Sequence, residues 1–422
     1  MDERKLQDLL ELALKAGAIH GTSPFPLGPS YLQRTLHDRV SLPEEVREAL
    51  VKELRDGGWG YDFDDRMLNT GFGSSRVTLV ALAEWLVSRA LEGGPHSAIQ
   101  HLRTFLSTDT TPGYEILAIA GLDISEPFPI NDTVSMVHLW ALPPSFAKDS
   151  LDPPLFKPEL LMKLGFPFAA VAQAEIPKVA LIRPIAISPK SCSPEETIQY
   201  TAIRDDVLFE ICGCITLVGP SSPVPVAHWA QVREDVPCAN HLGGGWGEVR
   251  HDIGLENRLR LSPDRSQQVS QIANDFLSLP DKVKRRLRVP LMRLNQAVRR
   301  RNPADQAIEL GIALEGLLLD DRPSSDQLSF TLRLRGAWYL GDNPESRKQE
   351  SARLKLLYEL RSRAVHTGNL PSDYEAGGRG RVPVKRLLDE GLHLCSSLIR
   401  KLIRAREFPN WDLLIYGDNP GL

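Results

Sequence analysis

The sequence predicts a multidomain α+β protein, because its character changes twice along the 422 residues. Residues 1–108 form a mainly helical N-terminal region, residues 109–250 a β-rich sensor or regulatory region, and residues 256–422 an all-α helical bundle. Helical spacing of apolar residues marks the first and last regions, whereas dense prolines and short β-type runs mark the middle one. At about 100–200 residues per domain, this length allows two or three domains.

Three stretches of the N-terminal region carry helix signals. Leucines recur at near-helical spacing over residues 6–14, and apolar residues form one stripe over residues 77–91. Between them, Ser41 is expected to cap a helix with Pro43 in its first turn, followed by two acids near the positive helix end. This region is therefore expected to pack as amphipathic helices.

A turn-rich stretch over residues 57–66 combines aromatic and acidic side chains. It is either a ligand loop or a hydrophobic loop that Trp59 and Phe63 anchor. The sequence leaves both interpretations open.

The middle region contains short runs that are rich in β-branched and aromatic residues. We expect strands over residues 133–142, 179–187, 207–218 and 224–229. The glycine-rich stretch 243–247 is typical of a connector or a tight turn. The order of the strands does not follow from the sequence.

The cysteines leave a second choice open. Five cysteines spread over a long chain argue against a disulfide framework. Cys212, Cys214, Cys238 and His241 have the form C-x-C followed by C-x2-H, which suggests a zinc site. The C-x-C spacing is unusual for structural zinc, and the apolar neighbours of the first pair favour ordinary core cysteines. We assign no metal and no cofactor.

The C-terminal region reads as about six successive helices, most of which begin with an N-cap residue, a proline or an acid. They are expected over residues 262–277, 279–301, 302–318, 326–340, 345–366 and 384–406.

The fifth of these helices ends with a pattern that suits RNA cleavage. Arg361 and His366 are separated by four residues. Histidine is suited to removing a proton from a 2′-hydroxyl at neutral pH, and arginine to binding the charge that grows on the phosphoryl oxygens. In a regular helix the two residues lie about 140° apart, whereas Ser362 shares the face of His366 and is placed to orient the imidazole. The alternative is a surface arginine and a histidine that stabilises the helix end.

The surroundings of this pattern resemble a known family. The blocks ALEGLLL (313–319), LSFTLRLRGAWYLG (328–341) and LLYELRSRAVHTG (356–368) together resemble the ApeA-like branch of the HEPN ribonuclease superfamily, over about residues 280–405. The resemblance implies a HEPN helical bundle and a metal-independent endoribonuclease that cleaves RNA through 2′-hydroxyl attack. It implies the catalytic residues Arg361, His366 and Ser362, and a homodimer that completes the site. Family members are typically prokaryotic, and several act in antiphage or abortive-infection systems. The sequence departs from the frequent His-Gly ending, because Thr367 stands between His366 and Gly368.

Two further features bear on this site. Glu315 lies on an otherwise apolar helix segment, where it either supports the site or holds the bundle by an ion pair with Arg361 or another arginine. Basic residues gather in the C-terminal region, as expected of a surface that attracts RNA, although a charge run is also simply a solvated face. The residues that we expect to contact RNA are Arg285, Arg286, Arg288, Arg293 and Arg363.

Composition and net charge restrict the expected location and partners of the protein. The net charge of −4 gives no global attraction to nucleic acid, no apolar run is long enough to span a bilayer, and the first residues lack a secretory signal. We therefore expect a cytoplasmic protein without a membrane partner. Its expected partners are RNA, a second copy of the chain, and a phage-derived trigger or another defence-system protein. The alternative function is a non-catalytic HEPN-like module for RNA or nucleotide binding or for dimerisation.

Overall fold

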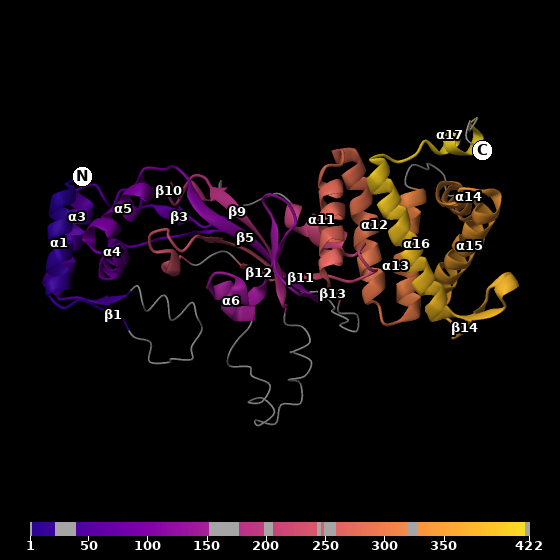
Figure 1. Cartoon of the computed structure of the whole chain (residues 1–422), viewed down its shortest axis with the longest axis horizontal. Coiled ribbons are helices and arrows are strands. Elements are labelled where there is room, and N and C mark those ends of the chain that lie inside the picture. Colours follow the sequence, from indigo (N-terminus) through magenta and orange to yellow (C-terminus); the bar gives the residue numbers. More distant parts are fainter. Residues whose placement is uncertain are drawn as a thin grey trace, which may run out of the picture. The chain divides into compact units, whose positions relative to one another are not determined.

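The computed structural model describes residues 2–21, 39–151, 177–197, 206–242, 246–248, 259–319 and 327–417 (Figure 1). These residues form a mixed α+β structure with a helical C-terminal region. They divide into two compact units, each built from three segments of the chain. The first unit contains residues 1–118, 133–205 and 226–250, and the second contains residues 119–132, 206–225 and 251–422.

The N-terminal part of the first unit is helical. Its main described helices are α1 (Glu3–Lys15), α3 (Glu44–Asp56), α4 (Leu79–Gly93) and α5 (Pro95–Leu106). Their apolar stripes form one core, in which Leu6, Leu10, Leu50 and Leu54 have no exposed surface. The helices predicted over residues 6–14 and 77–91 are confirmed as α1 and α4.

The start of α3 differs from the prediction. Ser41 does not cap this helix: α3 begins at Glu44, and Pro43 holds the N-cap position without a side-chain hydrogen bond. Ser41 belongs instead to strand β2 (Val40–Ser41), where it pairs with Ile19 of strand β1 (Ile19–His20). A residue that precedes proline favours extended backbone, so the chain stays extended up to Pro43 and places Ser41 too early to cap the helix.

A sheet occupies the centre of the first unit. Five of its strands are hydrogen-bonded neighbours in the order β12 (Trp246–Glu248), β11 (Val224–Val232), β5 (Thr111–Ala120), β9 (Val179–Ile187) and β8 (Ser135–His138). The strand predicted over residues 179–187 is confirmed, and the one predicted over 224–229 is confirmed and longer. Strand β8 pairs antiparallel with β9, with Met136 opposite Leu181.

Two predictions for the middle region are wrong in part. Residues 133–142 contain only the short strand β8, because a 3-10 turn, η1 (Leu139–Ala141), follows it. Trp246 and Gly247, predicted in a connector, belong to β12, where Trp246 pairs with Trp229. Residues 243–245 lie outside the described part of the chain.

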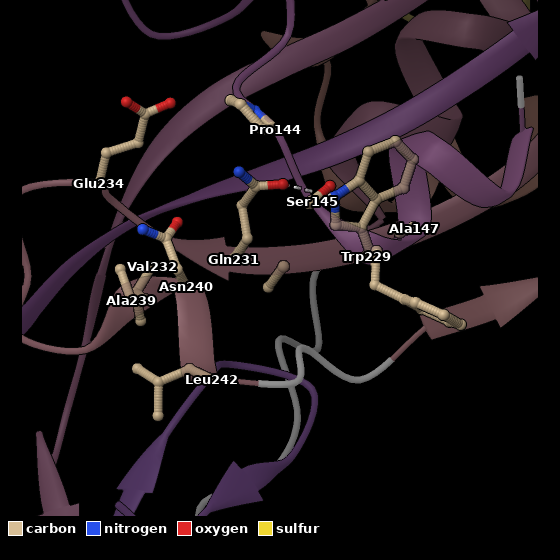
Figure 2. Close-up of a pocket in the computed structure, with 12 residues that line it drawn as sticks. Pro144, Ser145, Ala147, Trp229, Gln231, Val232, Glu234, Ala239, Asn240 and Leu242 are labelled. Atoms are coloured by element: carbon tan, nitrogen blue, oxygen red, sulfur yellow. Dashed lines mark hydrogen bonds between the residues drawn. The ribbon is translucent and has the colours of Figure 1, made fainter. Parts of the chain in front are cut away.

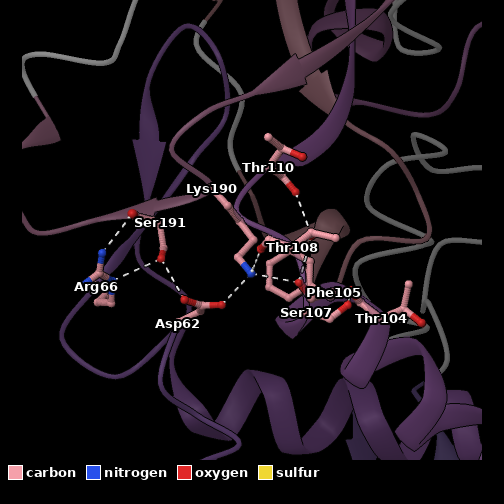
Figure 3. A network of polar contacts seen from close by, with 9 residues as sticks. All are labelled: Asp62, Arg66, Thr104, Phe105, Ser107, Thr108, Thr110, Lys190 and Ser191. Carbon is pink, nitrogen blue, oxygen red and sulfur yellow. Dashed lines mark hydrogen bonds and ion pairs between the residues drawn. The ribbon is translucent and has the colours of Figure 1, made fainter.

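A buried ion pair ties the turn-rich stretch 57–66 to strand β10 (Ser191–Cys192) and its neighbourhood (Figure 3). The Lys190 ammonium lies 2.7 Å from the Asp62 carboxylate and donates to the carbonyls of Phe105 and Thr108 at 2.8 and 2.5 Å. The Ser191 hydroxyl donates to Asp62 at 2.9 Å. Since Lys190 is only 4% exposed and its three protons all have acceptors, this network is structural.

Of the two interpretations of residues 57–66, the structure supports the hydrophobic loop. Trp59 and Phe63 are buried in the core of the first unit. Tyr61 projects outward and is 71% exposed. The two anchors and the Lys190–Asp62 pair fix the loop from both sides.

The second unit consists mainly of helices. They are α10 (Val207–Ile215), α11 (Pro263–Leu277), α12 (Asp281–Arg299), α13 (Pro303–Leu318), α14 (Leu328–Leu340), α15 (Pro344–Thr367), α16 (Val384–Ala405) and α17 (Trp411–Tyr416). The six helices predicted after residue 260 are confirmed, with ends that shift by one or two residues. Helix α13 packs against α12, α14, α15 and α16, and so forms the centre of the bundle.

Helix α10 corrects a predicted strand. Residues 207–218 were expected to be extended, but Val207–Ile215 is helical and turns follow it. The run is apolar almost throughout, and periodicity alone does not separate a buried helix from a buried strand in so short a segment. Small β structures complete this unit, namely the parallel pair β6 (Leu122–Ile124) and β13 (Leu259–Leu261), and the hairpin β14 (Asp373–Glu375) with β15 (Arg381–Pro383).

Helix α16 has the length of a membrane span but not its composition. Its buried residues form one apolar stripe, and charged residues occupy the opposite side. Within the described ranges no helix is both long and apolar enough to cross a bilayer.

We predict that Lys190→Met destabilises the first unit by about 3–5 kcal/mol, because it leaves the Asp62 carboxylate buried without its partner. Urea unfolding followed by fluorescence of the buried Trp59 and Trp85 measures this loss. Lys52→Met, at an exposed site on α3, is the matched control and is expected to change stability by less than about 0.5 kcal/mol. Equal unfolding midpoints for the two variants would contradict the structural role of the pair.

Candidate functional site at the end of helix α15

His366 lies in the last turn of α15 and is exposed to solvent. The helix continues through Thr367, and Gly368 ends it in the left-handed region at φ +67°. The Thr367 hydroxyl oxygen lies 2.8 Å from the carbonyl oxygens of both Arg363 and Asn369, so its one proton can be donated to either at the helix end. The imidazole is therefore held at an ordered, accessible end of the bundle.

Arg361 occupies a different environment. Its Nη2 lies 3.2 Å from Oε2 of Glu315 on α13, with side chains 27% and 23% exposed respectively. Of the partners that the sequence left open for Glu315, this is the one that the structure shows. The Arg361 Nε is buried and has no hydrogen-bond acceptor among the described residues. Arg361 thus ties α15 to α13.

Gly311 makes room for this arginine. A Cβ at Gly311 would lie 2.3 Å from Cγ and 3.0 Å from Cβ of Arg361. The stem of Arg361 therefore crosses α13 directly over this glycine. The contact involves the Cβ and Cγ atoms of Arg361 and not the flexible end of its side chain, so α15 lies close to α13 at Gly311.

The structure does not bring Arg361 and His366 to one side of the helix. Because α15 is continuous through Thr367, the two stay about 140° apart around its axis. Ser362 is half-buried and shares the side of His366. Within the described residues no hydrogen bond joins Ser362 to His366, so the expected orienting contact is not present in this state of the chain.

The residues expected to contact RNA divide into two groups. Arg288 lies 2.6 Å from Glu210, Arg293 lies 2.9 Å from Glu309, and Arg286 stacks on the Phe408 ring at 3.7 Å. Arg285 and Arg363 are exposed, and neither forms an ion pair with a described residue. Three of the five arginines predicted to contact RNA are thus engaged by other residues of the protein. A charge that is already paired attracts a phosphate less strongly.

Glu309 is a buried acid that the sequence reasoning missed. It lies on α13 and accepts from Arg293 and from Arg300, whose Nη2 is 2.6 Å away. The available signal was the one used for Glu315, namely an acid within an apolar helix segment. Glu309 and Glu315 both lie on α13, and each pairs with arginine from a neighbouring segment. These ion pairs connect the central helix of the bundle to the segments packed around it.

The cysteines do not form a metal site in the described residues. Cys212 and Cys214 are buried in helix α10 of the second unit, whereas Cys238 belongs to the first unit. Burial raises the pKa of Cys212 to about 12 and that of Cys214 well above its usual value, so both thiols stay protonated. The side chain of His241 lies outside the described residues. The described cysteines therefore fit the interpretation as core residues.

The first unit has a small pocket beside Trp229 (Figure 2). Trp229 donates from Nε1 to Gln231 at 2.9 Å, and Ser145, Glu234 and Asn240 complete the polar part of the lining. The volume of about 30 Å³ suits one or two water molecules, not a nucleotide. This pocket is not a candidate for an RNA site.

We predict a pH-dependent stability difference between the wild type and Glu315→Gln. Burial raises the pKa of Glu315, and this outweighs the lowering by Arg361. The folded state then holds the proton more tightly than the unfolded chain, so the contribution of Glu315 to stability is present at low pH and is lost as pH rises through its folded pKa. The wild type should therefore lose stability relative to the variant in urea unfolding as pH rises above the ordinary glutamate pKa of about 4.3.

The same comparison in an Arg361→Gln background serves as the control. Without the guanidinium, nothing opposes the effect of burial, and the loss with rising pH should be larger. A difference that stays constant with pH, or that favours the wild type as pH rises, contradicts this account.

We also predict that Gly311→Ala destabilises the second unit by about 1–3 kcal/mol through overpacking against Arg361. Alanine gains up to about 1 kcal/mol of helix propensity, which offsets only part of this loss. Gly378→Ala is the control, because a Cβ there meets no atom within 4 Å. The melting temperatures of the two variants measure both effects. An unchanged melting temperature for Gly311→Ala would show that the helices shift to accommodate the added methyl group.

Comparison with family models, with curated proteins and with solved structures found no match for the chain. The resemblance to HEPN proteins therefore depends on the sequence blocks of the C-terminal region. The site described above is judged by its own geometry. Its central feature is an exposed imidazole at the end of a helix whose other side is tied into the bundle.

Proposed function

We propose that the protein is a metal-independent endoribonuclease of the HEPN type. The observation that carries this proposal is the placement of His366, which is exposed in the last turn of α15 where an RNA strand can reach it. The HEPN-like sequence blocks and the exposed Arg285 and Arg363 support it. The proposed setting is prokaryotic antiphage defence, and this part depends on the family resemblance alone.

The proposed reaction is an internal transesterification. His366 removes the proton from a ribose 2′-hydroxyl, whose oxygen then attacks the adjacent phosphorus. The bond from phosphorus to the 5′-oxygen breaks, and that oxygen takes up a proton. The products are a 2′,3′-cyclic phosphate and a 5′-hydroxyl. One imidazole removes a proton and a second supplies one, which a two-fold dimer of this chain provides.

The alternative proposal is a non-catalytic module for RNA binding or dimerisation. One observation favours it: the Arg361 guanidinium, expected to stabilise charge on the phosphate, is held by Glu315 on the far side of the helix from His366. Such a module binds RNA without cutting it.

We predict that His366→Ala abolishes RNA cleavage by the full-length chain in EDTA. Loss of a general acid or base lowers the rate by about 10²–10⁴-fold. The assay follows cleavage of a mixed RNA pool on gels, together with analysis of the ends for 2′,3′-cyclic phosphate. His393→Ala replaces another exposed imidazole, on α16, and is expected to cut like the wild type.

Three results decide between the proposals. Equal cleavage by wild type and His366→Ala removes the proposed mechanism. Cleavage that requires His366 but leaves no cyclic phosphate indicates a different reaction. RNA binding without products from any of the three proteins supports the non-catalytic module.

A further inference from the structure

Two segments of the second unit carry a concentrated positive charge. Residues 281–286, at the start of α12, and residues 400–408, around the end of α16, together contain eight basic and two acidic residues. The whole chain has a net charge of −4, so this local charge is opposite in sign to that of the protein. A surface that concentrates charge of one sign attracts ligands of the other sign.

The two segments lie against each other. The Arg406 guanidinium donates to the Ser278 hydroxyl at 2.8 Å and also to the Ser278 carbonyl. The Arg286 guanidinium stacks on the Phe408 ring, with 3.7 Å between its central carbon and the ring centroid. Since Ser278 lies just before α12, these contacts join the start of α12 to the end of α16. We call residues 281–286 and 400–408 the basic surface.

Neighbouring acids do not neutralise the cations of the basic surface. Lys282, Arg285 and Arg404 are exposed, and none of them forms an ion pair with a residue that the structure describes. The carboxylate of Asp281 lies 3.5 Å from the ammonium of a different residue, Lys284. The surface therefore keeps most of its positive charge for a ligand.

The charges at the start of α12 do not stabilise that helix. Lys282 lies in its first turn, where the helix dipole disfavours a cation. Arg285 follows three residues later, at a spacing that brings two like charges together on the helix surface. Because this cost is not offset by ion pairs within the described residues, the arrangement favours an anion from outside the chain.

Helices α15 and α16 run in opposite directions past each other. They meet at Leu357 and Gly391, where a Cβ on the glycine would lie 2.6 Å from the leucine side chain. Ten residues further along α16, the Lys401 ammonium donates to the carbonyl of Tyr339 at 2.6 Å, and Tyr339 precedes the start of α15. The end of α16 is therefore beside the beginning of α15.

The basic surface and His366 consequently lie at opposite ends of the bundle. His366 is nine residues beyond Leu357 on α15, and Arg404 is thirteen residues beyond Gly391 on α16. At 1.5 Å per residue, these two positions are about 33 Å apart along the bundle. One phosphate cannot contact both, but one RNA strand can.

We propose that the basic surface binds the phosphate backbone of the RNA about ten nucleotides away from the phosphate on which His366 acts. This inference rests on the proposed function and adds a length requirement to it. A strand with one phosphate every 3.4 Å or so needs about ten nucleotides to cover 33 Å. The substrate is therefore an RNA longer than about ten nucleotides, and shorter RNAs lose the contacts to Lys282, Arg285 and Arg404.

The first experiment measures binding without cleavage. The probe is a single-stranded RNA of about 16 nucleotides that is fully 2′-O-methylated and so lacks the attacking hydroxyl. Arg285→Gln/Arg404→Gln should weaken binding about tenfold and reduce the slope of log affinity against log salt by about 1.4, since each phosphate contact on a single strand contributes about 0.7. Both side chains are exposed, so the melting temperature should stay that of the wild type.

Arg260→Gln/Arg265→Gln is the matched control for loss of two positive charges. Both arginines are exposed, and neither forms an ion pair with a described residue. Arg265 lies near the start of α11, about 20 Å along that helix from Ser278 and the basic surface. The control should bind the probe within about twofold of the wild type. Equal weakening by the two double variants would reduce the effect to general electrostatics and overturn the proposal.

A membrane with anionic lipids is another partner that a basic surface can attract. Vesicles of phosphatidylcholine and phosphatidylserine test this, and the wild type should not bind them at physiological salt. Vesicle binding that Arg285→Gln/Arg404→Gln abolishes, together with RNA binding that this variant retains, would assign the surface to lipid and overturn the proposal.

The second experiment tests the length requirement through cleavage. Each substrate is 2′-O-methylated except at one ribose, so it has one position that can be cut. A short substrate has about six nucleotides, and two long substrates extend it by about ten nucleotides on the 5′ or the 3′ side. One of the two extensions should raise kcat/KM of the wild type about tenfold. In Arg285→Gln/Arg404→Gln neither extension should raise it more than about twofold, and an equal gain in both proteins would exclude the second binding surface.

The outcomes separate this inference from the proposed function. If the wild type cuts RNA through His366 but Arg285→Gln/Arg404→Gln binds and cuts long RNA equally well, only the inference fails. If the wild type binds the methylated probe through Arg285 and Arg404 but cuts no RNA, the nuclease proposal fails and the binding surface remains. If the wild type does not bind the probe, the inference fails, and the His366→Ala comparison decides the proposed function separately.

Discussion

One half-buried ion pair, together with the buried residues Leu354, Leu357, Leu360 and Ala364, sets the orientation of helix α15. Arg361 crosses Gly311 and reaches Glu315, which fixes the side of α15 that faces α13. A helix has little rotational freedom once a charged pair and a close backbone approach specify one side. His366, about 140° away, must therefore face outward. The contact that ties Arg361 to α13 thus also leaves the His366 imidazole on the solvent side of α15.

Buried carboxylates paired with basic side chains recur in both units. In the second unit Glu309 binds Arg293 and Arg300, and in the first Glu115 binds Arg183 and His228. Removing one partner of such a pair costs far more than the pair itself contributes, because the remaining charge stays desolvated. These pairs hold specific segments in register. They also offset part of the positive charge that the composition of helix α12 suggested, since Arg293 pairs with Glu309 and Arg288 with Glu210.

Much of the helical structure followed from the sequence, and the exceptions have physical causes. Periodicity located α1 and α4, and N-cap residues, prolines and acids at helix starts located the six helices after residue 260. Sequence reasoning failed at α10, which is apolar except for Glu210. It also failed at Ser41, where the cap was assigned without regard to the extended backbone before Pro43. Strand pairing was not predictable, because it depends on contacts between residues far apart in the chain.

The candidate site was predictable in the same partial way. The separation of Arg361 and His366 around the helix follows from their spacing, and the continuous helix through Thr367 preserves it. The engagement of Arg361 by Glu315 was one of two open alternatives. The availability of Arg363 had no local signal, since Glu359 stands four residues before it and suggests a neutral pair. Only the structure shows that Glu359 lies 3.7 Å from the Lys355 ammonium, and this contact changes the charge balance.

This balance bears on how a dimer of the chain would work. In the proposed two-fold arrangement, each copy contributes the same exposed side of α15, so two imidazoles and two Arg363 guanidiniums approach one another. The Arg361–Glu315 pairs stay within their own bundles and add no net charge. The two guanidiniums repel each other unless an anion lies between them, and an RNA phosphate supplies that anion at the point where the imidazoles act. In this arrangement, substrate binding and completion of the site are the same electrostatic event.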